Sequence, residues 1–224
     1  MAAPAPRRPP STSPDHPTTR EEEPTTTFSR GFRGRPSAIA EKLPPGQYDI
    51  GDGFPVLSAG PTPKTDLDRW DFTVQGQVDA AARWTWQEFQ ALPHEDLTVD
   101  IHCVTSWSKF GTRWRGVSLD TLLAAVRTDA VHLTAFCDGG YTTNLDLADV
   151  TGGKAWVVDT YDGQPLAPQH GGPVRLLVPH LYFWKSAKWC RGLALTTATE
   201  PGFWETFGYH LRGDPWREQR YSND

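Results

Sequence analysis

The sequence predicts a sheet-rich α+β domain. Short runs in which apolar and polar residues alternate outnumber the segments with helical periodicity, and alternation is typical of strands that bury one face. These runs do not alternate regularly with helices, so a parallel sheet built from βαβ units is not expected. The 224 residues contain neither an internal repeat nor heptads, and they suffice for one sizeable domain.

In the first half of the domain, strands are expected on either side of a short helix. Residues 70–78 alternate as a strand. A capping box begins at Thr85 and predicts a helix that runs to about Ala91, before a proline ends it. Residues 97–103 alternate again, and residues 118–127 carry leucines and a valine at helical spacing, which predicts an amphipathic helix.

The second half contains strands separated by turns. Residues 131–137 alternate as a strand and stop at an Asp-Gly-Gly sequence. A further apolar run covers residues 155–158, and the Asp-Gly pair at 162–163 predicts a turn after it. Strands are also expected at 174–178, between two prolines, and at 189–195.

Two N-terminal segments differ from this domain. Residues 1–27 hold seven prolines, six threonines and no aromatic residue, so they are expected to be a disordered tail. Residues 28–67 are predicted to form an irregular arm that wraps the domain, which itself covers residues 68–224. The expected apolar anchors of the arm are Phe28, Phe32, Leu43, Tyr48, Phe54 and Leu57.

Charge and composition exclude several classes of protein. The net charge is −5, which argues against general nucleic-acid binding, so the basic cluster of Arg175, Lys185, Lys188 and Arg191 indicates local anion recognition. No stretch approaches the ~20 apolar residues of a membrane span. The Arg7-Arg8 pair lacks the apolar region of an export signal, and a cytoplasmic location is therefore predicted.

Cys103 is the main candidate for chemistry. The chain has three cysteines and no C-x-x-C pair, so neither a disulfide framework nor a tetrahedral zinc site is expected. Cys103 ends a predicted strand, where functional sites are often built, although a buried inert thiol also fits its apolar face. Cys137 and Cys190 lie inside predicted strands and are expected to be inert.

Two later segments combine glycines with polar side chains. Asp138 is followed by two glycines and Tyr141, which suits either a simple turn or close approach of a ligand. His170 and Arg175 flank a Gly-Gly-Pro sequence, and Lys188 follows in an aromatic setting. Ten tryptophans are many for this length and are suited to the walls of a deep pocket.

Three functions remain open on these residues alone. Thiolates select soft metals, and arginine and lysine clamp phosphates, so Cys103 with the basic cluster suits a soft metal on an anionic cofactor. Cys103 could instead be the nucleophile of a thiol hydrolase with His170 or His102 as its base. The third candidate is a non-catalytic module that binds an anion.

Five motifs in order make the chain similar to a known family. Over about residues 45–216 it resembles the molybdopterin-binding domain of the sulfite oxidase family, closest to short bacterial sulfite oxidase-like oxidoreductases, and it is also similar to the catalytic subunit of methionine sulfoxide reductase. The motifs are Ile101-His102-Cys103-Val104-Thr105-Ser106-Trp107-Ser108, Asp138-Gly139-Gly140-Tyr141-Thr142-Thr143, His170-Gly171-Gly172-Pro173-Val174-Arg175, Lys185-Ser186-Ala187-Lys188-Trp189, and Pro201-Gly202-Phe203-Trp204-Glu205 with Gly208-Tyr209-His210.

The resemblance implies a molybdenum-pyranopterin cofactor and a set of residues that hold it. Cys103 corresponds to the metal-binding cysteine, with Trp107 and Tyr141 as further catalytic-site residues. On position alone, Lys109, Arg113 and Tyr141 are expected in the substrate pocket. The implied cofactor contacts are Leu57, Ser58, Ala59, Gly60, Asp138, His170, Arg175, Ser186, Ala187 and Lys188. The implied activity is oxygen-atom transfer to or from a small sulfur- or nitrogen-containing substrate.

The chain also departs from this family in ways that bear on function. It has no haem-binding domain, no dinucleotide-binding G-x-G-x-x-G motif and no cysteine cluster for an iron–sulfur centre, so a separate flavin or haem protein is expected as electron partner. The anion-binding arginines of sulfite oxidases have no clear counterparts, which weakens the case for sulfite as the substrate.

Overall fold

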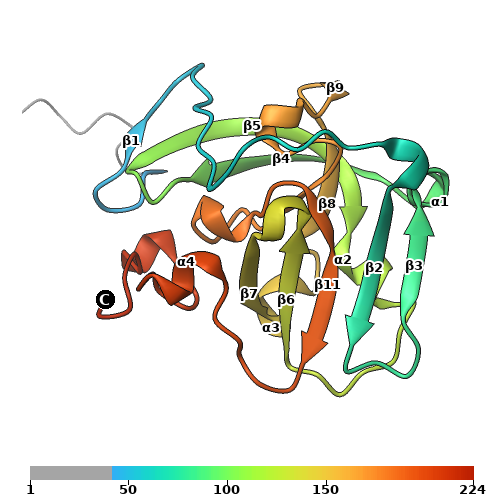
Figure 1. Ribbon diagram of the computed structural model, residues 1–224. Coiled ribbons are helices and arrows are strands. Elements are labelled where there is room, and N and C mark those ends of the chain that lie inside the picture. Colours follow the sequence, from blue (N-terminus) through green and yellow to red (C-terminus); the bar gives the residue numbers. More distant parts are fainter. Residues whose placement is uncertain (1–41) are drawn as a thin grey trace, which may run out of the picture. The chain divides into compact units, whose positions relative to one another are not determined.

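The computed structural model describes residues 42–224, which form two β-sheets joined by short helices and turns (Figure 1). The predicted tail at 1–27 and the first part of the predicted arm, with Phe28 and Phe32, lie outside the described residues. Within residues 42–224, no helix is both long and apolar enough to cross a membrane.

The first sheet has six strands. Its order is β1-β5-β8-β10, with β4 also paired to β5 and β9 to β8, and β1 runs parallel to β5. The strands are β1 (Tyr48–Asp49), β4 (Glu95–His102), β5 (Trp107–Ser118), β8 (Trp156–Tyr161), β9 (Gln164–Pro165) and β10 (Arg175–Leu177).

The second sheet has five strands in the order β3-β2-β11-β6-β7, in which β2 and β11 are parallel and the other pairs antiparallel. These strands are β2 (Asp71–Gly76), β3 (Ala82–Thr85), β6 (His132–Cys137), β7 (Thr142–Asp146) and β11 (Cys190–Thr196). The sheet-rich α+β class predicted from the alternating runs is confirmed.

Short helices connect the strands. They are α1 (Trp86–Ala91), α2 (Leu119–Leu123), α3 (Leu147–Val150) and α4 (Phe203–Thr206), with 3-10 turns η2 (Leu67–Arg69), η3 (Asp138–Gly140), η4 (Pro168–His170), η5 (Phe183–Lys185) and η6 (Pro215–Arg217). The capping box predicted at Thr85 is present, since its hydroxyl accepts from Glu88 N and the Glu88 carboxylate accepts from Thr85 N.

The helix predicted over residues 118–127 is wrong in its length. Helix α2 ends at Leu123, and the following turn has bonds to the third residue back, from Ala125 N to Leu122 O and from Val126 N to Leu123 O. Arg127 N then donates to the Asp79 carboxylate, while Asp79 N donates to Arg127 O. These two hydrogen bonds to Asp79 hold the backbone of Arg127 in a non-helical position, so the helix does not continue.

The two sheets share one core. Val157 of β8 and Leu176 of β10 point into the cluster that also holds Phe72, Leu133 and Leu193 of the second sheet. The neighbours of these two residues on the same strands, Val158 and Leu177, point the other way, into a smaller cluster with Cys103, Trp107 and Trp114. Strands β8 and β10 of the six-stranded sheet are therefore buried on both faces, as alternating side chains on a strand allow.

The described part of the predicted arm covers that second face. Ile50 and Phe54 pack against the smaller cluster, and Leu43 is half-buried. Tyr48 and Leu57, predicted as anchors, are instead about half exposed, at 54% and 50%. Tyr48 is held by its backbone, whose N–H donates to Ser106 O, so its ring is free to face solvent.

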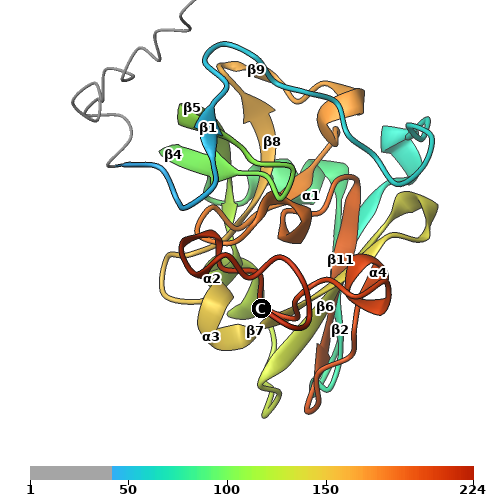
Figure 2. The same cartoon turned by 90° about the vertical axis from the view of Figure 1, so that its left-hand side faces the viewer.

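The segments around Cys103 come together at one side of the molecule. In Figures 1 and 2, strand β1, the turn between β4 and β5 and the C-terminal segment lie near one another. Arg220 joins them, because its guanidinium donates to the carbonyls of Val104 and Pro45.

Candidate functional site

Cys103 lies in the tight turn between β4 and β5. Its N–H donates to Trp107 O (2.8 Å), its carbonyl accepts from Ser106 N (3.0 Å), and Ser106 takes a positive φ of 74° to close the turn. The Cys103 Sγ lies 3.1 Å from the Thr105 hydroxyl, and burial raises the pKa of the thiol. Without a bound cofactor, the protein therefore holds a protonated Cys103 thiol in a tight, hydrogen-bonded turn.

Among residues 42–224, the thiol has no histidine partner of the kind that a hydrolase needs. His102 Nδ1 lies 2.8 Å from the Ser108 hydroxyl, and the His170 ring is stacked on Phe54 at 4.1 Å. The hydrogen-bond partner of the Cys103 Sγ is the Thr105 hydroxyl. The arrangement thus does not favour the Cys–His nucleophile considered from the sequence.

Arg175 and Lys188 form a cationic end of the cavity, together with His170. The Arg175 guanidinium donates to the carbonyls of His170 (2.9 Å) and Ser186 (2.5 Å) and lies over the Phe183 ring at 4.0 Å. The Lys188 ammonium donates to Leu57 O and to the carbonyl of the neighbouring η4 turn, both at 2.7 Å. Burial lowers the pKa of Arg175 to about 9 and that of Lys188 to about 8.

Neither cation has a counter-ion in the described part of the chain. No carboxylate of residues 42–224 lies within 4.0 Å of Arg175 or Lys188, and the buried Arg175 Nε has no hydrogen-bond partner there. A buried cation without a partner is costly, and charge-assisted bonds from Arg and Lys suit phosphate. This end of the cavity therefore fits an anionic cofactor.

The glycines near the site have two different roles. Gly139 and Gly140 line the cavity with positive φ angles of 83° and 81°, and a Cβ at either would meet nothing within 4 Å. They leave room for a ligand. Gly171 and Gly172 serve internal packing instead, because a Cβ at Gly172 would lie 2.0 Å from the Leu166 carbonyl.

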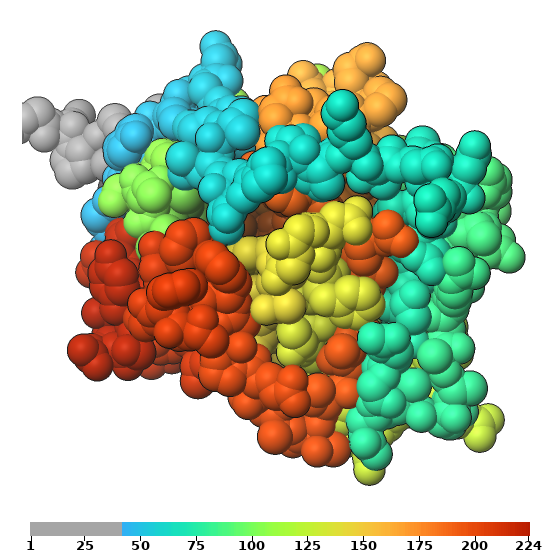
Figure 3. Space-filling view, viewed as in Figure 1, coloured from blue at the N-terminus to red at the C-terminus, as the bar shows by residue number. Residues whose placement is uncertain are grey.

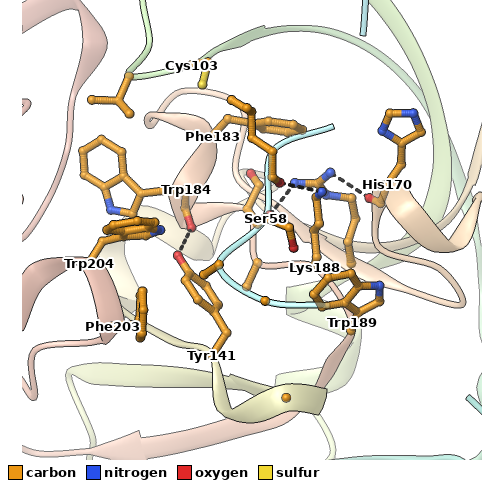
Figure 4. A pocket seen from close by; sticks show the side chains of 18 of the residues that line it. Ser58, Cys103, Tyr141, His170, Phe183, Trp184, Lys188, Trp189, Phe203 and Trp204 are labelled. Carbon is orange, nitrogen blue, oxygen red and sulfur yellow. Dashed lines mark hydrogen bonds between the residues drawn. The ribbon is translucent and has the colours of Figure 1, made fainter. Parts of the chain in front are cut away.

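Aromatic side chains form the other end of the cavity. Figure 4 shows Tyr141, Trp184, Phe203 and Trp204 opposite His170 and Lys188, with Cys103 between the two groups at one edge. The Tyr141 hydroxyl donates to Trp184 O (2.7 Å), and its ring lies 5.8 Å from that of Phe203.

All the catalytic and cofactor-binding residues predicted from the sequence line one cavity, which has a volume of about 530 Å³. In the space-filling view it opens as a hollow beneath residues of the arm (Figure 3). The residues are Leu57, Ser58, Ala59, Gly60, Cys103, Trp107, Asp138, Tyr141, His170, Arg175, Ser186, Ala187 and Lys188. Their individual roles stay predictions.

Two residues expected near the substrate lie outside the cavity. The Lys109 ammonium donates to Gly51 O, and Arg113 forms an ion pair with Asp162 on the surface. Both belong to β5, which carries them away from Cys103.

Sequence reasoning missed much of the aromatic wall. The cavity is also lined by Phe54, Phe183, Trp184, Phe203, Trp204 and Tyr209. Phe203, Trp204 and Tyr209 belong to a recognised motif, but nothing in their spacing indicated a cavity wall. Asp138 also proves to be engaged, since it lies 3.4 Å from the Arg191 guanidinium.

Comparison with known proteins gives the class of enzyme. Residues 59–204 match the family model described as "Oxidoreductase molybdopterin binding domain". The chain is 40% identical over 193 residues to "Uncharacterized oxidoreductase YuiH" of Bacillus subtilis, covering 85% of this chain and 97% of that protein. It is 32% identical over 152 residues to "Putative protein-methionine-sulfoxide reductase subunit YedZ1" of Azospira oryzae, covering 67% of this chain and 58% of that protein.

A solved structure agrees in fold. The sulfane dehydrogenase SoxCD from Paracoccus pantotrophus matches with a TM-score of 0.56 and 18% identity, over 62% of this chain and 41% of that one. The family model over residues 59–204 and the 40% identical relative show that the chain belongs to the sulfite oxidase-like family of molybdopterin-dependent oxidoreductases. The family, the cofactor and the enzyme class predicted from the motifs are confirmed.

Proposed function

We propose that this oxidoreductase transfers an oxygen atom to or from a small sulfur- or nitrogen-containing substrate at a molybdenum ion bound by Cys103. The observation that carries the proposal is one cavity with a buried thiol at one edge and, at one end, two cations that have no counter-ion within residues 42–224. Its relatives by name include a sulfoxide reductase subunit and plant nitrate reductases, whose names fit oxygen-atom chemistry at sulfur and nitrogen.

The cationic end is assigned to the phosphate of the cofactor. Arg175, Lys188 and His170 supply positive or polar groups, and the free Arg175 Nε supplies a further donor. The pterin would contact Leu57, Ser58, Ala59 and Gly60 of the arm, together with Asp138, Ser186 and Ala187. When bound, the cofactor supplies the redox chemistry, and the protein supplies position and electrostatics.

The residues around Cys103 prepare it as a ligand. A cysteine binds metal as a thiolate, so binding must release the proton that burial holds on the free thiol. The turn from Cys103 to Trp107 fixes the sulfur, and Trp107 packs in the same buried cluster as Cys103. Tyr141 lines the aromatic end of the same cavity. Electrons would come from a separate flavin or haem protein, and the cytoplasmic location stays a prediction.

Cys103→Ser tests the assignment of the metal ligand. Protein made in cofactor-competent cells should carry about one molybdenum per chain. The Cys103→Ser variant should retain the pterin, lose the thiolate-to-metal absorption and lose turnover with one-electron dyes. Cys190→Ser is the matched control, because Cys190 is a buried thiol that does not line the cavity. Normal turnover by Cys103→Ser would overturn the assignment.

A further inference from the structure

Cys137 and Cys190 lie opposite each other on two neighbouring strands of the second sheet. Both are free thiols, and they are paired in the antiparallel register of β6 and β11, which run side by side in Figure 1. Asp138 N donates to Trp189 O (3.0 Å). This bond joins the residue after Cys137 to the residue before Cys190, a pattern that flanks a non-hydrogen-bonded pair, in which the two side chains come closest.

The spacing of such a pair suits a disulfide. The two Cα atoms of a non-hydrogen-bonded pair lie about 4.5 Å apart, within the range of about 4.4–6.8 Å that disulfides span. Cys190 N donates to Val174 O (3.2 Å), and both thiols belong to the same buried cluster, so their side chains point to the same side of the sheet. An S–S bond can therefore form without a new path of the backbone.

The pair stands at the ends of two segments that line the cavity. Cys137 directly precedes the lining residues 138–141. Cys190 directly follows the lining residues 186–189. Tyr141 of the lining packs against the cluster that holds both thiols. Cys137 is 9% exposed and Cys190 is fully buried, so Cys137 is the thiol that a small oxidant reaches first.

We propose that Cys137 and Cys190 are a redox-modification site, at which hydrogen peroxide forms a reversible disulfide that tethers the two cavity-lining segments. The Cys137 sulfur attacks peroxide, the O–O bond breaks, and a sulfenic acid and one water result. The Cys190 sulfur then attacks the sulfenic sulfur, the S–S bond forms and a second water leaves. In total the thiols lose two electrons and two protons, which peroxide takes up, and a dithiol reductant reverses the change. Neither step uses the metal or its substrate, so this proposal is independent of the proposed function.

The reaction should be slow at neutral pH. Contact with Cys190, followed by burial, raises the pKa of the Cys137 thiol well above its ordinary value. The neighbouring Asp138 carboxylate raises this pKa further, whereas the Arg175 guanidinium lowers it. The thiolate is the form that attacks peroxide, and the raised pKa keeps its population small. The site therefore suits a response to sustained exposure to peroxide.

Peptide mapping of the holoprotein tests the proposal. The full chain with bound cofactor is incubated with hydrogen peroxide, digested without reductant and analysed by mass spectrometry. The expected product is a linked pair of peptides that joins Cys137 to Cys190 and that dithiothreitol separates. A link that includes Cys103 instead, a sulfinic acid at Cys137 without a link, or no oxidation of either thiol would overturn the proposal.

Thermal melts test the tether. The disulfide should raise the melting temperature by several degrees, because closing a loop of roughly 50 residues restricts the unfolded chain. Cys137→Ala should lose this peroxide-induced increase, whereas Cys103→Ser, the matched control, should keep it because Cys103 lies outside the pair. The reduced variants are melted beside the reduced parent, so that folding is checked separately. An unchanged melting temperature in the linked protein would show that the bond does not tether the cavity segments.

Discussion

Arg175 and Lys185 are both buried cations, ten positions apart, but within residues 42–224 only Lys185 has a carboxylate partner. Lys185 pairs with Glu205 and also donates to Asn144, whereas Arg175 donates to two backbone carbonyls and lies over Phe183. A charge that the fold neutralises contributes to stability once it is in place. A charge that the fold leaves without a partner is suited to an external anion. The contrast thus separates a structural cation from a ligand-binding one.

The largest expected effect is on stability, at the neutralised cation. Lys185→Met leaves Glu205 buried without its partner, and breaking a buried pair in this way costs about 3–5 kcal/mol in the free energy of unfolding. Urea unfolding of the cofactor-free protein measures it. The double variant with Glu205→Gln should recover much of the loss, and a single variant as stable as the parent would remove the distinction between the two cations.

Arg175→Met should give the opposite pattern. Cofactor affinity should fall about 10- to 100-fold, because a charge-assisted bond to the anion is lost. The free energy of unfolding of the empty protein should change by less than about 1 kcal/mol, since removing an uncompensated buried charge offsets the two lost bonds to carbonyls. Molybdenum content under limiting cofactor and urea unfolding measure the two effects. Full metal loading would place the anion site elsewhere.

The smallest expected effect is a pH dependence at Lys188. Burial lowers its pKa to about 8, so the ammonium is charged below that pH and neutral above it. Binding of inorganic pyrophosphate to the cofactor-free protein should therefore weaken as pH rises, by about twofold between roughly pH 7 and 8, below the pH at which Arg175 titrates. Isothermal titration calorimetry measures it. The Lys188→Arg variant keeps its charge and should flatten the profile, and an equally steep profile in that variant would assign the titration to another group.

Local patterns predicted the elements well, because alternation and capping depend on neighbouring residues. The strands at β2, β4, β6, β8, β10 and β11 and helix α1 were all expected near their observed positions. The C-terminal end of α2 was not predicted. The chain leaves the helix where Arg127 bonds to Asp79, which lies 48 positions away in the sequence.

The cavity was predicted only in part for the same reason. Motifs identified Cys103 and the cationic end, but the Lys185–Glu205 pair and the aromatic wall exist only once η5 and α4 pack together. The close packing of Gly172 against Leu166 could not be predicted either, because sequence cannot tell space left for a ligand from space filled by another part of the chain.

The contacts that close the cavity join residues far apart in the chain, which has a consequence for folding kinetics. Lys188 bonds to Leu57 across 131 positions, and Arg220 bonds to Val104 across 116 and to Pro45 across 175. High contact order slows folding, because the entropy of closing long loops is lost before such contacts form. We therefore expect the cavity to form late in folding, so that the cofactor binds a chain that has already folded. By mass action, the bound cofactor then stabilises the folded state against unfolding.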